Sequence, residues 1–206
     1  MNILYEYEVT ESKVIAFYAK NKKKEKYPVE TLKSVQAMFL FAIFSCQRFS
    51  DVKKLKDATI KGNKLKFNQV KTTGQVHAVL NDYAREIAEK YNYNFPTWSN
   101  QYVNLVLHHL FEMIGLKREI KSVKYIGAQR IDICEPLYIA VGFHWSRKSH
   151  ATLSLEKGMR PETVMAQGGW KDRDSFKKYI AVSQSMLDAE MEKAWGKPNA
   201  ELKRVG

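Results

Sequence analysis

The chain has 206 residues, of which 45% are hydrophobic and 27% charged, and these proportions exclude disordered, collagen-like and coiled-coil proteins. Its length suits one folded domain with at most a short appendage. The 34 lysines and arginines outnumber the 22 aspartates and glutamates, and the resulting net charge of +12 favours a polyanionic partner, nucleic acid above all.

The first half of the chain begins with a lead-in helix and linker (1–30). Thr10 is expected to cap its short helix. From Thr31 to Phe44 apolar residues fall on every face, which is typical of a buried helix. Ser50 is then expected to cap a second helix, DVKKLKD, so that two helices meet around Arg48.

The hydrophobic period changes to that of β-strands between residues 58 and 80. Three short segments are separated by turns at Gly62 and Gly74, which predicts a small antiparallel sheet. Lys71 lies at the edge of the second turn. This sheet is the main departure from a helical pattern, so we expect an α+β fold that is mainly α.

Helical patterns return after the sheet. They cover 81–91 and Asn100–Ile114, and Ser99 is expected to cap the second of them. A hairpin around Gly127 is predicted next. The remaining helices are expected at 145–157, 161–168, 174–180 and 184–195.

The sequence argues against a membrane span, a secretory signal, a disulfide, a structural metal and a cofactor. The longest apolar stretch, Val35–Cys46, is short of the ~20 residues of a membrane span, and no secretory signal is visible, so we expect a cytoplasmic protein that does not bind membranes. Cys46 and Cys134 are expected to be buried free thiols. None of the five histidines has a cysteine partner at short spacing, so we expect no structural metal and no cofactor.

One pair of residues points to anion binding. His144 and Arg147 are three residues apart at the start of a predicted helix, so they share a face near the positive helix end. The same spacing also occurs by chance on helix surfaces. Further motifs decide between these two interpretations.

The segment HWSRKSHATLSLEKGMRPETVMAQGGWKDRDSFKKY resembles the active-site region of the tyrosine recombinases, the phage integrase family. That family shows H-x-x-R, a helix, a glycine break, a second helix, and a G-H or G-W pair nine residues before a nucleophilic tyrosine. The segment matches this order and spacing without a gap. The matching residues are His144, Arg147, Gly158, Gly169, Trp170 and Tyr179.

Two boxes upstream extend the resemblance. QRFSDVKKL is similar to the family's first-arginine box through Arg48, Ser50, Asp51 and Leu55, and VKTTGQVHAVL is similar to its hairpin-lysine box through Lys71. The phrase FPTWSNQYVNLVL also resembles integrases of mobile elements from the Bacteroides group. Together the match runs from about residue 31 to residue 195.

The resemblance implies a helical tyrosine-recombinase catalytic domain that cleaves and rejoins double-stranded DNA at specific sites. Tyr179 would attack phosphorus and form a 3′-phosphotyrosyl intermediate, which conserves bond energy. Arg48 and Arg147 would hold the non-bridging phosphate oxygens, because planar guanidinium groups suit that task. Lys71 would be the general acid for the departing 5′ oxygen.

The remaining site residues have supporting roles in this interpretation. His144 would hydrogen-bond the phosphate or assist proton transfer. Trp170 takes the place where many relatives carry histidine, and its indole N–H can donate a hydrogen bond but cannot shuttle a proton. Asp51 would orient Arg48 without touching the phosphate, and His150 is a candidate core residue.

Other interpretations stay open at this point. Arg48 beside Asp51 could be a structural ion pair, and Lys71 could be an ordinary solvated turn lysine. The whole chain could be a non-catalytic DNA-binding accessory protein with the same fold. It could also be a relaxing enzyme like the type IB topoisomerases, which share the chemistry.

The resemblance also implies a division of the chain and a set of partners. We expect the catalytic core at 31–182 and a C-terminal helix or tail at 183–206. In the family such a tail docks on a neighbouring subunit of a synaptic complex, which is expected to be tetrameric on DNA; the alternative is a tail folded on its own core. Full recombinases also carry an N-terminal helical domain that 1–30 is too short to supply, so a catalytic fragment is expected.

Overall fold

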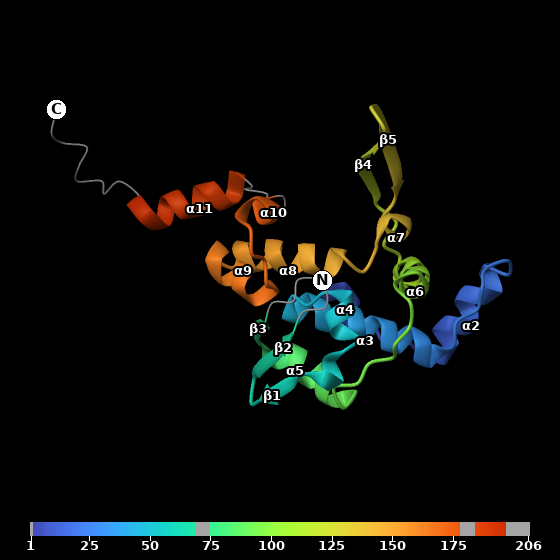
Figure 1. The fold of residues 1–206 in the computed structure, drawn as a ribbon. Helices are drawn as coiled ribbons and strands as arrows, with labels where there is room; N and C mark the ends of the chain where they lie inside the picture. Colours follow the sequence, from blue (N-terminus) through green and yellow to red (C-terminus); the bar gives the residue numbers. More distant parts are fainter. Residues whose placement is uncertain (1, 69–74, 178–183, 197–206) are drawn as a thin grey trace.

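The helix α3 (Val29–Ser45) is the centre on which the other elements pack. The computed structural model describes residues 2–68, 75–177 and 184–196. Within them α3 contacts α5 (Asp82–Lys90), α6 (Asn100–Met113) and α8 (Trp145–Glu156), which surround it in Figure 1. Because apolar side chains cover every face of α3, only a position inside the protein removes them all from water.

The predicted lead-in segment packs into the same core. It forms α1 (Asn2–Glu6), which was not expected, and α2 (Glu11–Lys20), whose N-cap Thr10 accepts a hydrogen bond from the Lys13 N–H, as expected. Gln36 of α3 donates to the carbonyls of Leu4 and Tyr7 at 2.8 and 2.7 Å. These bonds satisfy a buried amide and tie the first turn of the chain to the central helix.

The corner after α3 differs from the sequence expectation. A helix capped by Ser50 was predicted, and this was wrong: α4 (Phe49–Val52) starts from Arg48 as N-cap, and a separate 3₁₀ turn, η1 (Leu55–Asp57), follows. Val52 and Leu55 are both buried. Ser50 lies inside α4, and its hydroxyl donates to the Asp51 carboxylate at 3.5 Å instead of capping a helix.

The predicted small sheet is confirmed in the described residues. It consists of β1 (Thr59–Lys61), β2 (Lys64–Asn68) and β3 (Gln75–Val79), antiparallel and in that order. Gly62 closes the first turn with a positive φ of 58°, which glycine adopts without strain. The second predicted turn, with Gly74 and Lys71, lies outside the described residues.

A second hairpin stands away from the body of the molecule (Figure 1). Its strands are β4 (Glu119–Ile126) and β5 (Gln129–Pro136), which turn at Gly127 as predicted. Cys134 on β5 is exposed, so the expectation that it is buried was wrong, whereas Cys46 is buried. A strand pattern alone does not show whether a hairpin lies on the core or projects from it.

The C-terminal part of the chain is helical in the described residues. Its helices are α7 (Leu137–Ala140), α8, α9 (Pro161–Gly168), α10 (Arg173–Lys177) and α11 (Gln184–Trp195). The helix α7 lies beside the β4–β5 hairpin, and α9, α10 and α11 lie on the other side of the molecule (Figure 1). A small apolar cluster joins α8, α9 and α10. None of the helices in the described residues is both long and apolar enough to cross a membrane.

The packing of α3 generates a stability prediction. Phe41 is fully buried and its ring lies 5.4 Å from that of Phe95. We expect Phe41→Ala to lower the free energy of unfolding by about 3–5 kcal/mol, because it leaves a cavity in the core. Denaturant titration followed by circular dichroism measures this loss. The control Ile15→Ala, at a side chain 63% exposed, should change it by less than about 0.5 kcal/mol.

Candidate active site

The buried guanidinium of Arg147 is the centre of the candidate site. Arg147 lies on α8 and is only 2% exposed. Its Nη1 donates to the carbonyl of Cys46 at 2.9 Å and to the carbonyl of Gly168 at 2.8 Å. Both carbonyls stand at helix C-terminal ends, where backbone oxygens lack helical partners and the dipole favours a cation. Burial of the charge is thereby compensated.

The end of α3 is shaped to present one of these carbonyls. Cys46 adopts the left-handed conformation, with φ at 66°, and its N–H still bonds to the Ala42 carbonyl at 3.0 Å. A non-glycine residue in this region is uncommon and is held by its surroundings. Burial raises the pKa of the Cys46 thiol to about 12, so it stays protonated at neutral pH and is no nucleophile.

The end of α9 supplies the other carbonyl and closes with a Schellman arrangement. The Gly169 N–H donates to Ala166 and the Trp170 N–H donates to Met165, at 3.1 and 2.9 Å. Gly169 has a φ of 66°, which suits glycine at this position. The turn delivers the Trp170 side chain to the arginine.

Trp170 covers Arg147. The Arg147 guanidinium carbon lies 3.7 Å from the centre of the Trp170 ring, a cation–π contact in a buried setting. The ring also lies directly over Gly168, where an added Cβ would come within 2.1 Å of the indole. Only glycine permits this approach, so the Gly-Gly-Trp sequence has a steric reason.

Trp170 also anchors the next helix. Its ring meets that of Phe176 edge to face, with centroids 5.0 Å apart, and Phe176 on α10 is fully buried. Phe176 stands three residues before Tyr179 in the sequence. The anchor therefore holds the described chain that leads toward the predicted nucleophile.

Arg48 reaches the same helix end as Arg147. Its Nη2 lies 3.4 Å from the Gly169 carbonyl, and its Nη1 lies 3.9 Å from the Asp51 carboxylate, which is 4% exposed. The two arginines are thus attached to the consecutive carbonyls of Gly168 and Gly169. Asp51 lies beside Arg48, and its role in orienting that arginine stays a prediction.

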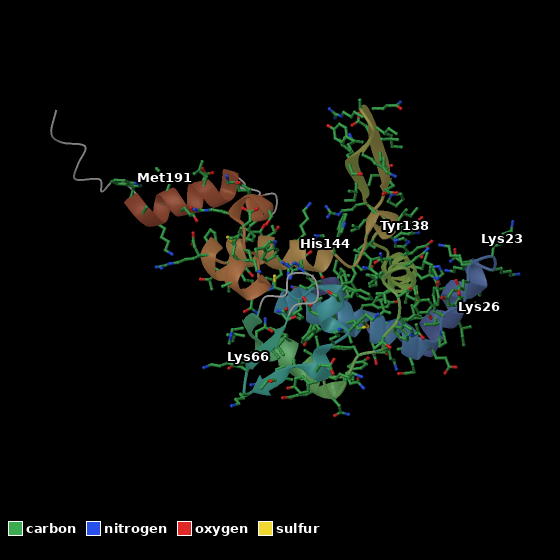
Figure 2. All side chains as sticks on the ribbon, in the orientation of Figure 1. Lys23, Lys26, Lys66, Tyr138, His144 and Met191 are labelled. Atoms are coloured by element: carbon green, nitrogen blue, oxygen red, sulfur yellow. The ribbon has the colours of Figure 1, made fainter. Side chains whose placement is uncertain are left out.

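The histidines occupy two different environments. His144 is exposed at the N-terminal end of α8 (Figure 2), whereas Arg147, one turn on, is covered. His150 is buried and its Nδ1 lies 2.7 Å from the Ile43 carbonyl. Burial lowers the pKa of His150, the charge of Arg147 lowers it further, and the Ile43 hydrogen bond opposes both effects. His150 is therefore a neutral core residue at pH 7.

The described residues bring together four of the predicted site residues. Arg48, Asp51, Arg147 and Trp170 meet at the ends of α3 and α9, and His144 lies at the start of the helix that carries Arg147. The predicted acid Lys71 and the predicted nucleophile Tyr179 lie outside the described residues. In the described part of the chain, no group of three or more His, Cys, Asp or Glu side chains could hold a metal.

Sequence reasoning missed the backbone partners of the arginines. The backbone carbonyls of Cys46 and Gly168 accept hydrogen bonds from Arg147. Every residue has a backbone carbonyl, so this role cannot be recognised from the residue type. The doublet Gly168–Gly169 before Trp170 was the one available hint, since two adjacent glycines suggest a close approach of side chain to backbone.

Comparisons with known proteins identify solved structures that have a similar fold. Neither a scan against protein-family models nor a search of curated proteins found a match. Among solved structures, the XerH site-specific recombinase bound to palindromic difH substrate, a post-cleavage complex, has a TM-score of 0.54 at 13% identity, over 90% of this chain and 52% of that one. The XerH pre-cleavage complex with difH has a TM-score of 0.53 at 14% identity, and the match covers 89% of this chain and 53% of the XerH chain. The XerA recombinase has a TM-score of 0.57 at 9% identity, and the match covers 92% of this chain and 65% of the XerA chain.

These structures establish the fold of the chain. It is the mainly helical α+β fold of tyrosine recombinase catalytic domains, as the sequence predicts. The chain spans about half the length of the XerH structures that it matches.

The close approach at Gly168 generates a prediction. We expect Gly168→Ala to push the Trp170 ring off Arg147 and to lower the free energy of unfolding by about 1–3 kcal/mol, because the added methyl overlaps the indole. The NMR shift of the Trp170 indole N–H and a denaturant titration measure the two effects. Gly142→Ala is the matched control, since its added Cβ would meet nothing nearer than 3.8 Å. An unmoved indole signal in Gly168→Ala would contradict the prediction.

Proposed function

We propose that this protein is the catalytic domain of a site-specific DNA recombinase or integrase, which cleaves and rejoins DNA through Tyr179. The observation that carries the proposal is the attachment of Arg48 and Arg147 to consecutive carbonyls at the end of α9, under Trp170. The recombinase fold and the net charge of +12 support it. The structurally similar XerH was solved with its DNA substrate.

The arginine pair suits a phosphate. The Arg48 side chain is 21% exposed, although its Nη1 is buried and lies beside the Asp51 carboxylate. A non-bridging phosphate oxygen would approach the exposed part of this side chain, and the fixed guanidinium would stabilise the charge that develops on a five-coordinate phosphorus. Because Arg147 is held by backbone carbonyls, it would keep its position as the reaction proceeds.

The proposed reaction proceeds in two balanced steps. The Tyr179 hydroxyl gives up its proton to solvent as its oxygen attacks phosphorus, and the bond to the 5′ oxygen breaks, which leaves a 3′-phosphotyrosine and a free 5′ hydroxyl. Lys71 gives the proton to the departing oxygen, and His144 hydrogen-bonds the phosphate. A 5′ hydroxyl then returns its proton to Lys71 as it attacks the phosphotyrosine, which restores the DNA backbone and releases Tyr179 to be reprotonated from solvent. The phosphodiester energy is conserved, so no nucleotide cofactor is needed.

The proposal extends to assembly. The helix α11 exposes the apolar side chains of Leu187, Met191 and Trp195, the last of them 82% exposed (Figure 2 labels Met191). Such a face favours docking on a neighbouring subunit over residence in water. It supports the proposal that the chain acts in a multi-subunit complex on DNA, expected to be a tetramer.

The nucleophile is tested by trapping a covalent complex on a nicked suicide substrate taken from the ends of the parent element. We expect Tyr179→Phe to fold and bind DNA like the wild type but to give no adduct, because only the hydroxyl is lost. The matched control is Tyr83→Phe, at a tyrosine 51% exposed on α5, which should give normal adduct. Adduct formation by Tyr179→Phe would move the nucleophile elsewhere, with Tyr138 and Tyr125 the next candidates.

The acid is tested by changing the leaving group. We expect Lys71→Ala to cleave ordinary DNA about 10²–10⁴-fold more slowly, because a 5′ alkoxide leaves poorly without a proton. The rate should recover on a substrate whose 5′ bridging oxygen is sulfur, since a thiolate leaves unaided. Lys66→Ala, at an exposed residue of β2 (Figure 2), is the control and should cleave both substrates normally. Equal impairment of Lys71→Ala on both substrates would make His144 the better candidate for the acid.

A further inference from the structure

The outer edge of β3 is bound by a side chain of α9. Gln167 accepts a hydrogen bond from the Val79 N–H through Oε1 at 2.9 Å, and its Nε2 donates to the Val79 carbonyl at 2.8 Å. β3 is an edge strand, paired on its other side with β2. The amide therefore pairs with both backbone groups of Val79, as a residue of a neighbouring strand would.

The same amide also reaches the central helix. Gln167 Nε2 donates to the Ser45 carbonyl at 3.2 Å, and the buried Gln47 side chain donates to Ser45 at 2.7 Å. Gln47 lies 3.4 Å from the Gln167 carbonyl as well. The end of α3, the end of α9 and the edge of β3 are thus joined at one residue.

Gln167 lies next to the glycines that hold the two arginines. Gln167 immediately precedes Gly168 and Gly169, whose carbonyls hold Arg147 and Arg48. β3 in turn follows β2 by way of residues 69–74, which contain Lys71 in the sequence. Gln167 is therefore the side-chain link between the turn that holds the arginines and the strand pair that carries the proposed acid.

We infer that Gln167 is a positioning residue that sets the placement of the β2–β3 strand pair relative to the two arginines, and thereby aligns general-acid catalysis. The inference rests on the proposed function, because it assigns Gln167 to the step in which the 5′ oxygen departs.

The link is separate from the attachment of the sheet to the core. Leu65, Ala78 and Leu80 are buried at 1 to 2% exposure and hold the sheet through apolar contacts. Asn81 adds a hydrogen bond to the Phe44 carbonyl at 3.1 Å. Removal of the Gln167 amide therefore leaves the sheet folded, but frees the outer edge of β3 to shift, and displacements of about 1 Å cost up to ~10²-fold in rate at catalytic sites.

The amide is required because it both donates and accepts. Gln167→Met keeps nearly the same length and volume but removes all three hydrogen bonds of the amide. Gln167→Glu keeps the acceptor for the Val79 N–H, but places a carboxylate against the carbonyls of Val79 and Ser45, which repel it. The matched control is Gln101→Met, at an exposed glutamine on α6.

The first measurement uses the protein without DNA. Hydrogen exchange of the Val79 N–H, followed by NMR, should be at least about tenfold faster in Gln167→Met than in the wild type and in Gln101→Met. The reason is that the Val79 N–H loses its acceptor, the Gln167 side-chain oxygen. Gln167→Glu should retain part of the protection. Unchanged exchange in Gln167→Met would overturn the contact itself.

The second measurement compares cleavage of the ordinary and the sulfur-substituted suicide substrates. We expect Gln167→Met and Gln167→Glu to cleave ordinary DNA roughly 10–100-fold more slowly than the wild type, and the sulfur substrate within about threefold of it, because only proton delivery is impaired. Gln101→Met should match the wild type on both. A normal rate on ordinary DNA, or equal loss on both substrates, would overturn the positioning role.

The two measurements separate this inference from the proposed function. If the wild type forms no adduct on either substrate, the recombinase proposal fails and the catalytic role of Gln167 fails with it, whatever the Val79 exchange rates show. If the wild type cleaves and Lys71→Ala recovers on sulfur but Gln167→Met does not, only the inference about Gln167 fails.

Discussion

The candidate site depends on one buried cation. Arg147 is placed inside the protein, where an unpaired charge would be prohibitively unfavourable, and it is tolerated because two helices end with their unpaired carbonyls aimed at it. The left-handed turn at Cys46 presents one of these carbonyls, and the Trp170 ring that covers the arginine leaves no room for a side chain at Gly168. The ends of α3 and α9 are held together by the same guanidinium that is proposed to meet the phosphate, so structural and proposed chemical roles coincide in one group.

The end of α9 acts as a shared platform. Consecutive backbone groups there contact Arg147 and Arg48, the preceding side chain of Gln167 binds β3, and the following ring of Trp170 packs on Phe176. The four consecutive residues 167–170 therefore fix the relative positions of the two arginines, β3 and α10, which are distant from one another in the sequence. A site that stabilises a transition state needs such preorganisation, because groups that must move to reach the developing charge lose much of their effect.

Two exposed elements contrast with this rigid centre. The described side chains of the β4–β5 hairpin and α11 lie mostly outside the core, and Val123, Tyr125 and Trp195 among them are exposed to solvent. Their exposure supports the proposal that the chain acts in a multi-subunit complex, where neighbouring molecules would cover surfaces that are open in one copy.

Most of the helices, the antiparallel sheet, the buried α3 and the set of chemically able residues could be predicted from the sequence, because these follow from local periodicity, capping and motif spacing, whereas α1 was not expected. Tertiary structure decided the rest. It started α4 from Arg48 instead of Ser50 and ended it at Val52, and it exposed Cys134 by projecting its hairpin outward. It also placed Arg147 under Trp170 and gave Gln167 its partners. Those contacts join backbone atoms and residues up to 122 positions apart, and a backbone carbonyl is the same in every residue, so no local pattern could reveal them.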